Sequence, residues 1–281
     1  MQSKKPIIVV LFLLFTSTLY SQHLRGHFIT TEKLNKGKEY CDDLDFITVD
    51  KAETFIFCKS VYTHKYDYRK ALNVIEIAQK KYPYSYNIRL EKALALNDLG
   101  SHTTASKEII GLIKLYPNKF ELHNYLARIQ YENDRVMSVM PFIFSVIINP
   151  SNPQASENIT FIKRLLSSRL MNWEVDSNAM ETLGYTRPNS FDFVKYKLIR
   201  DAKYNESDTR LFLINKIYLL ANALEETPHN KNGFFWNYYA QYFSELKSER
   251  LIETAVDYML NPSDSKAFNK LKEINSNFGI K

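Results

Sequence analysis

Residues 71–83 read ALNVIEIAQKKYP, and residues 105–117 read ASKEIIGLIKLYP. Both segments end in Tyr-Pro, and three small or apolar positions recur at an offset of 34 residues: Ala71, Ile75 and Ala78 return as Ala105, Ile109 and Leu112. A period of this length is typical of stacked helix pairs, because one helical hairpin cannot bury its own apolar face. We therefore expect the stretch from Ala52 to Asn118 to form helical hairpins that pack on one another.

The pattern resembles the tetratricopeptide repeat family. In the first copy, large residues precede a small one in the second helix, and a proline closes the repeat: Phe55, Tyr62, Ala71, Ile75, Ala78 and Pro83. The second copy has Ala93, Gly100, Ala105 and Pro117 at the family's positions. Lys59 departs from the pattern, since the family prefers a small residue there. The resemblance implies close helix crossings at the small side chains and a proline that ends each second helix.

A third, degenerate copy follows. Its first helix would contain Leu126 and Ala127, its turn Asn133-Asp134, and its second helix would end at Asn149-Pro150. We predict an all-α fold: a tetratricopeptide-like solenoid over 52–150, followed by a helical region over 151–281. The chain has only 7 Gly in 281 residues, which disfavours the positive-φ turns of β-rich folds and phosphate-binding loops.

The N-terminus has the order of a secretory signal. Lys4-Lys5 precede nine apolar residues, Ile7–Phe15, and a short polar stretch follows. We expect residues 1–21 to be a signal peptide cut after Ser21, at a Tyr-Ser-Gln junction that resembles those of exported Bacteroidetes proteins. The alternative is an uncleaved anchor, although spanning a bilayer takes roughly 20 apolar residues. The protein would then be periplasmic, cell-surface or secreted, with no stable membrane span after cleavage.

Residues 22–51 show no helical period, and we expect an irregular segment there. Cys41 and Cys58 are the two cysteines of the chain. After export they would meet an oxidising compartment, where a bridge could pin this segment to the first repeat. The alternative is that Cys58 is a small core residue.

The region 151–281 alternates helical periods with breaks. A loop or hinge is expected at 172–189, and Asp208 is positioned to cap the helix that follows it. Ser263 is expected to cap the last helix. The aromatic helix 234–246 carries the densest ring cluster, at helical spacings that usually indicate core. An exposed platform for a sugar or a peptide is the alternative.

No catalytic or cofactor motif accompanies the repeats. The sequence lacks Gly-x-Ser-x-Gly, His-Glu-x-x-His and phosphate-binding glycine loops, and its histidines are scattered. We therefore predict a non-enzymatic protein with no cofactor and no metal. An enzyme with a site assembled around 172–189 is the lesser alternative. A net charge of +6, without a basic stripe, argues against a nucleic-acid partner.

The predicted function is binding of a protein or peptide partner on the concave face of the repeats. Five residues of the first helices are the candidates, because their side chains can hydrogen-bond or stack on an extended segment: Asn87, Asn97, Asn124, Arg128 and Tyr131. A solvated role for the polar members is the alternative. A glycan-binding accessory protein of the cell envelope is the second hypothesis, with Trp236 or Tyr131 as exposed rings.

Overall fold

The computed structural model describes residues 30–131, 134–167, 191–200, 207–227 and 231–280. Within these ranges every regular element is helical and no strand occurs, which confirms the all-α prediction. The chain divides into two compact units, Met1–Glu108 and Ile109–Lys281, and each is described by itself below. The signal segment and the 172–189 loop predicted from the sequence lie outside the described residues.

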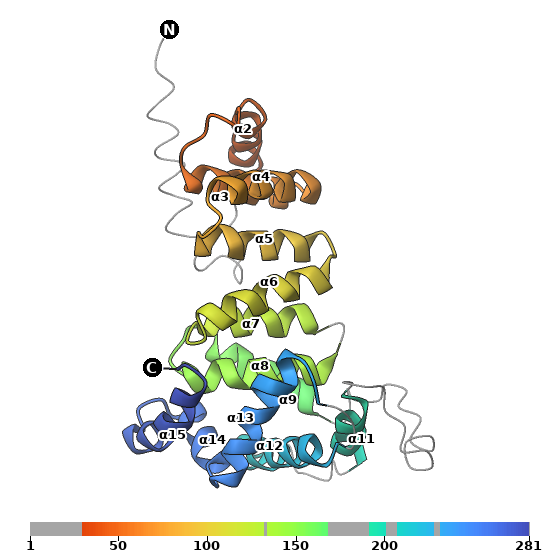
Figure 1. Cartoon of the computed structure of the whole chain (residues 1–281), viewed down its shortest axis with the longest axis vertical. Helices are drawn as coiled ribbons and strands as arrows, with labels where there is room; N and C mark the ends of the chain where they lie inside the picture. The colour runs from red at the N-terminus through yellow and green to blue at the C-terminus, as the bar shows by residue number, and fades with distance from the viewer. Residues whose placement is uncertain (1–29, 132–133, 168–190, 201–206, 228–230, 281) are drawn as a thin grey trace. The chain divides into compact units, whose positions relative to one another are not determined.

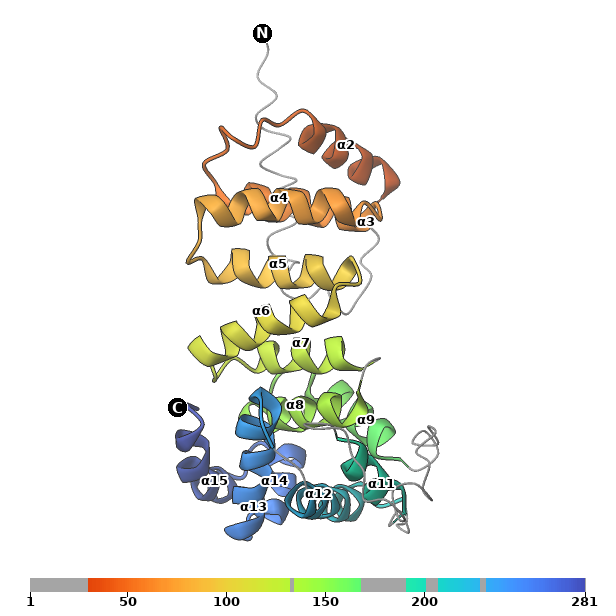
Figure 2. The same ribbon diagram turned by 45° about the vertical axis from the view of Figure 1, so that its right-hand side comes forward.

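Unit 1 contains four helices and the first part of a fifth: α2 (Thr31–Asp42), α3 (Ala52–His64), α4 (Tyr68–Lys81), α5 (Tyr86–Asp98) and α6 (His102–Leu115). Helices α3 and α4 form a hairpin, and α5 packs against both of them (Figures 1 and 2). The recurring small and apolar positions lie inside: Ala71, Ile75 and Ala78 are at most 1% exposed, as is Ala105. Burial thus coincides with the sequence pattern.

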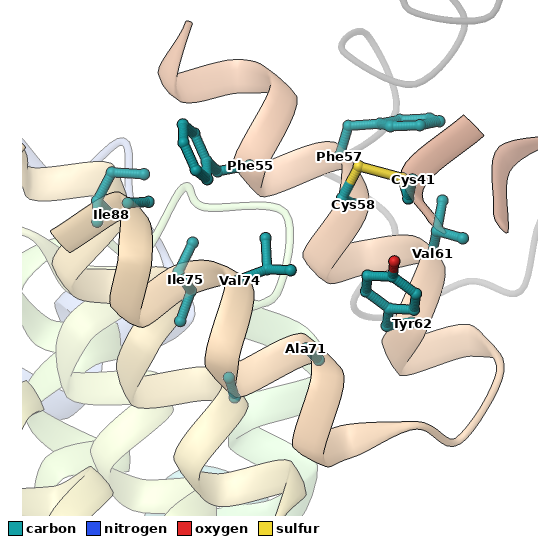
Figure 3. Packing of buried hydrophobic residues seen from close by; sticks show 12 residues of the cluster. Cys41, Phe55, Phe57, Cys58, Val61, Tyr62, Ala71, Val74, Ile75 and Ile88 are labelled. Carbon is teal, nitrogen blue, oxygen red and sulfur yellow. A yellow bond between two sulfur atoms is a disulfide. The ribbon is translucent and has the colours of Figure 1, made fainter. Parts of the chain in front are cut away.

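Helix α2 corrects the expectation of an irregular 22–51 segment. Thr30 caps the helix by accepting a hydrogen bond from the backbone N–H of Lys33, at 3.4 Å. The helix has no apolar stripe that could predict it, because only Gly37 and Cys41 are buried. A disulfide joins Cys41 to Cys58 of α3 (Figure 3). The helix is therefore stabilised by a link to α3 that hydrophobic periodicity does not reveal.

Unit 2 begins with the α7–α8 hairpin, and α8 also packs against α9. The helices of this unit are α7 (Phe120–Gln130), α8 (Arg135–Ile148), α9 (Ala155–Leu166), α11 (Asp192–Arg200), α12 (Thr209–Glu226), the π-helical η2 (Phe235–Ala240), α13 (Gln241–Ser248), α14 (Ile252–Leu260) and α15 (Ser265–Asn277). Asp208 caps α12 as predicted, accepting from the Leu211 N–H at 3.0 Å. The cap of α15 is Asp264 and not Ser263, because a carboxylate one residue later reaches two backbone N–H groups.

Rings fill the core of unit 2. Tyr239, Tyr242 and Phe243 are fully buried, and Phe144 of α8 packs edge-on against both tyrosines at 5.4 and 4.7 Å. Trp236 stacks on Phe191 with ring centroids 4.3 Å apart. The aromatic segment 234–246 is therefore mainly core, the first of the two interpretations that its spacing allowed.

One type of helix end recurs in both units. Four residues adopt the left-handed conformation just after a helix: Tyr66, Gly100, Arg250 and Gly279. In each case the N–H of the next residue donates to the carbonyl five residues back, at 2.8–3.0 Å: Asp67 to Tyr62, Ser101 to Leu96, Leu251 to Leu246, and Ile280 to Asn275. Tyr66 and Gly100 are 34 residues apart, so the period extends to the turn between paired helices.

The second recurring end is an X-Pro pair. Tyr82, Tyr116, Asn149 and Asn261 each donate their N–H to the carbonyl four residues back, and each is followed by proline. Proline cannot continue the helix, so the chain turns there. The α13–α14 hairpin uses both kinds of end, with Arg250 at its inner turn and Pro262 after its second helix. It shares the turn chemistry of the α3–α4 hairpin with a shorter second helix, nine residues in α14 against fourteen in α4.

Replacing Ala105 by Arg tests the packing at the small positions. Ala105 is 0% exposed, so the longer side chain overpacks the site and buries a charge. We expect the free energy of unfolding to fall by several kcal/mol, about 3 or more, in urea titrations followed by circular dichroism. Thr104→Arg, at the exposed neighbouring position, is the matched control and should change stability little. Equal stability of the two variants would contradict the packing.

Candidate functional site

The predicted partner-binding residues of unit 2 lie on one face of α7 and contact α9. The Asn124 amide donates to the Gln154 side-chain oxygen, and the Arg128 guanidinium pairs with Glu157 at 3.4 Å. Tyr131 packs edge-on against Phe161 at 6.2 Å. The structure thus brings these three residues together, but it commits each of them to a neighbour within the chain. Asn124 is only 3% exposed, which contradicts the expectation of a solvated or ligand-facing amide.

The predicted residues of unit 1 are more accessible. Asn87, in the first turn of α5, is exposed. Asn97, near the end of the same helix, is half-buried, and its Oδ1 lies 2.9 Å from Nδ1 of His102. Ten residues of helix separate the two side chains, a rise of roughly 15 Å. They can therefore contact one extended segment only at separate points.

A buried histidine is the strongest polar feature that the sequence analysis did not identify. His123 of α7 is 0% exposed. Its Nε2 lies 2.8 Å from the Pro117 carbonyl, which can only accept, so Nε2 carries the proton. Its Nδ1 then accepts from the Tyr239 hydroxyl at 2.6 Å. Since 116 residues separate His123 from Tyr239, no local pattern could have paired them.

Burial keeps His123 neutral. It lowers the pKa of the imidazole from its usual 6.5 to about 4, while the hydrogen bond to Pro117 acts in the opposite direction. The same burial raises the pKa of the Tyr239 hydroxyl well above 10. Both groups therefore hold their protons in place at neutral pH. Their contact joins α7 to η2, and the geometry fits a structural hydrogen-bond chain better than a base poised for catalysis.

Next to this chain, unit 2 has an open hollow of about 360 Å³. Its walls come from the end of α6, the π-helical turn, α13 and the end of α15: Ile113, Lys114, Pro117, Phe234, Asn237, Tyr238, Gln241, Glu245, Asn277 and Phe278. Phe234 and Tyr238 stack at 5.1 Å. The hollow's polar lining consists largely of amides, which exchange hydrogen bonds without titrating. The hollow is thus suited to holding a polar group and not to proton transfer.

Gly279 shapes the rim of the hollow. A Cβ atom at this position would lie 2.6 Å from Cγ of Pro117, and the φ of 77° also favours glycine. The Tyr238 hydroxyl donates to the Phe278 carbonyl at 3.1 Å. The end of α15 is therefore fixed closely against the turn that begins at Pro117.

The rings named for glycan binding are differently placed from the expectation. Trp236 is 5% exposed and stacked on Phe191, so neither face is available to a sugar. The expectation of Trp236 as an exposed platform is wrong, because the π-helical turn directs this ring into the core. Tyr131 is half-buried beside Phe161.

Metal and membrane sites were also sought in the described ranges. Among those residues no group of three or more His, Cys, Asp or Glu side chains is placed to hold a metal ion. In the same ranges, none of the helices combines the length and the apolar character that crossing a bilayer requires. The enzyme alternative, which rested on 172–189, concerns residues outside these ranges.

No protein-family model matches the chain, and no curated protein matches it. The functional argument therefore depends on the chain's own geometry.

The pH dependence of stability tests the buried imidazole. The unfolded chain binds a proton at this histidine below about pH 6.5, whereas the folded chain resists protonation down to about pH 4, so acidification favours unfolding across this interval. We expect His123 to contribute a loss of up to about 1.4 kcal/mol per pH unit between these values.

Urea unfolding at half-unit pH steps, with His123→Gln as the comparison, measures this contribution. The stability difference between wild type and variant should shrink as the pH falls from 6.5 to 4. A difference that stays constant over this range would show that His123 is not held neutral.

Proposed function

We propose that the protein is an exported, non-enzymatic scaffold of tetratricopeptide-like hairpins that binds a segment of a protein partner. The observation that carries the proposal is the 34-residue period. It recurs in the sequence, in the burial of Ala71 and Ala105, and in the left-handed turns at Tyr66 and Gly100. Helical repeats of this type form extended surfaces and have no intrinsic chemistry, so binding is the function they suit.

The disulfide supports the export part of the proposal. Cys41 and Cys58 are bridged, and such bridges persist in oxidising compartments such as the periplasm or the cell exterior. The charged and apolar order of residues 4–15 points to the same destination.

The exposed amides of α5 are the best-placed contacts for a partner. Asn124, Arg128 and Tyr131 are engaged by α9, so a ligand would have to displace those contacts. Asn87 is free on the surface and Asn97 is partly accessible. Amide side chains can pair with the backbone of an extended segment, because they both donate and accept hydrogen bonds. We therefore place the partner contact at Asn87 and Asn97.

Site-specific photo-crosslinking tests this placement. A photoreactive amino acid would replace Asn87 or Asn97 in the full chain, expressed in its native cells, and Asn73 would be replaced in the control. Asn73 is an exposed asparagine on α4 of the same unit. We expect a discrete protein adduct from Asn87 and Asn97 and none from Asn73. No discrete adduct at either position, or identical adducts at Asn73, would contradict the proposal.

A further inference from the structure

Helix α2 is too weak to stand alone. It has twelve residues, a length at which isolated helices are marginal in water, and Gly37 in its interior costs roughly 1 kcal/mol relative to alanine. Only Gly37 and Cys41 are buried, so little apolar surface holds it. Its helical state must therefore depend on specific links to the rest of unit 1.

Those links are concentrated at its C-terminal end. Cys41 forms the disulfide with Cys58, and the neighbouring Asp42 accepts hydrogen bonds from the Tyr62 hydroxyl and the Lys70 ammonium, both at 3.0 Å. The hydrogen bond from Lys38, followed by that from Lys70, holds the pKa of Asp42 at about 2. Asp42 is partly exposed, and exposed ion pairs contribute little stability. The covalent bond is thus the main attachment.

Helix α2 covers an apolar part of α3. Phe57 is 5% exposed and Val61 is 1% exposed. Both side chains lie near the disulfide on the side of α3 that meets α2 (Figure 3). The approach is close, since a Cβ on Gly37 would lie 3.2 Å from Cγ2 of Val61, and Tyr40 packs edge-on against Phe57 at 6.1 Å. Removal of α2 would therefore expose Phe57 and Val61 to solvent.

We propose that α2 is an oxidation-dependent latch: it is unfolded while Cys41 and Cys58 are thiols, and it docks over Phe57 and Val61 only when the disulfide forms. The reduced chain presents an apolar face on α3 that the oxidised chain lacks. Formation of one covalent bond thus converts unit 1 from an open surface to a covered one.

The chemistry requires a disulfide-bearing oxidant. One cysteine thiolate attacks the oxidant's disulfide to give a mixed disulfide and releases one thiolate. The second thiolate then attacks the protein sulfur of that mixed disulfide, forms the Cys41–Cys58 bond and expels the other thiolate. Two electrons and two protons pass from the cysteines to the oxidant. In the open form both thiols are accessible, whereas after docking Cys41 and Cys58 are 1% and 0% exposed, so the product is shielded from reduction.

Hydrogen–deuterium exchange with mass spectrometry tests the latch on the full chain, oxidised or reduced with dithiothreitol. Alkylation would confirm that both thiols are free. We expect the amides of residues 35–43 to exchange about a hundredfold faster after reduction, a factor that matches the typical contribution of a bridge closing a short loop. The amides of α3 and α4 should stay protected. Glutathione disulfide should restore protection in the wild type and not in Cys41→Ala.

Two results would overturn the proposal. Unchanged protection of residues 35–43 in the reduced chain would show that α2 docks without the bridge. Loss of protection across α2, α3 and α4 together would show that the bridge stabilises the whole unit and does not act on α2 alone. Asp42→Asn is the matched comparison, since it removes the polar links and leaves the disulfide. It should raise exchange in α2 much less than reduction does.

Discussion

Close approach of helices at small side chains is the constraint on which the rest of the structure depends. Ala71 and Ala105 are essentially unexposed, and each lies at the same place in its hairpin, 34 residues apart. A larger side chain there would hold the paired helices apart, and the apolar positions one and two turns away would lose their contacts. The left-handed turns at Tyr66 and Gly100 and the prolines after Tyr82 and Tyr116 then set where each helix ends. Packing and chain reversal thus repeat together.

Where the small residue is missing, charge takes its place. Lys59 of α3 is 3% exposed, and its ammonium lies 3.1 Å from Glu91 and 3.9 Å from Asp98, both on α5. A buried ammonium is costly without partners, so the departure from the repeat pattern at Lys59 is balanced by acids on the adjacent helix. In unit 2 the compensation is aromatic. Rings from α8, η2 and α13 fill the core, and the His123–Tyr239 hydrogen bond ties α7 to the same cluster.

The features that could be predicted from the sequence are those with a local cause. Helical periods, the Asp208 cap and the burial of most of the aromatic segment follow from residues within a few turns of one another. The features that could not are set at a distance. Helix α2 lacks an apolar stripe and depends on a bond to Cys58, and His123 meets a tyrosine far along the chain. The partner surface was only partly predictable for the same reason: the spacing placed Asn124, Arg128 and Tyr131 on one face but did not reveal that α9 covers it.

The account's central claim is that the two sequence copies pack as equivalent hairpins. Methyl-selective nuclear Overhauser spectroscopy on alanine-labelled protein tests it most directly. Equivalent packing predicts contacts from the Ala71 methyl to Tyr62 and from the Ala105 methyl to Leu96, the residue 34 positions later. Contacts from Ala105 to a different face of α5, or none to α5 at all, would contradict the account.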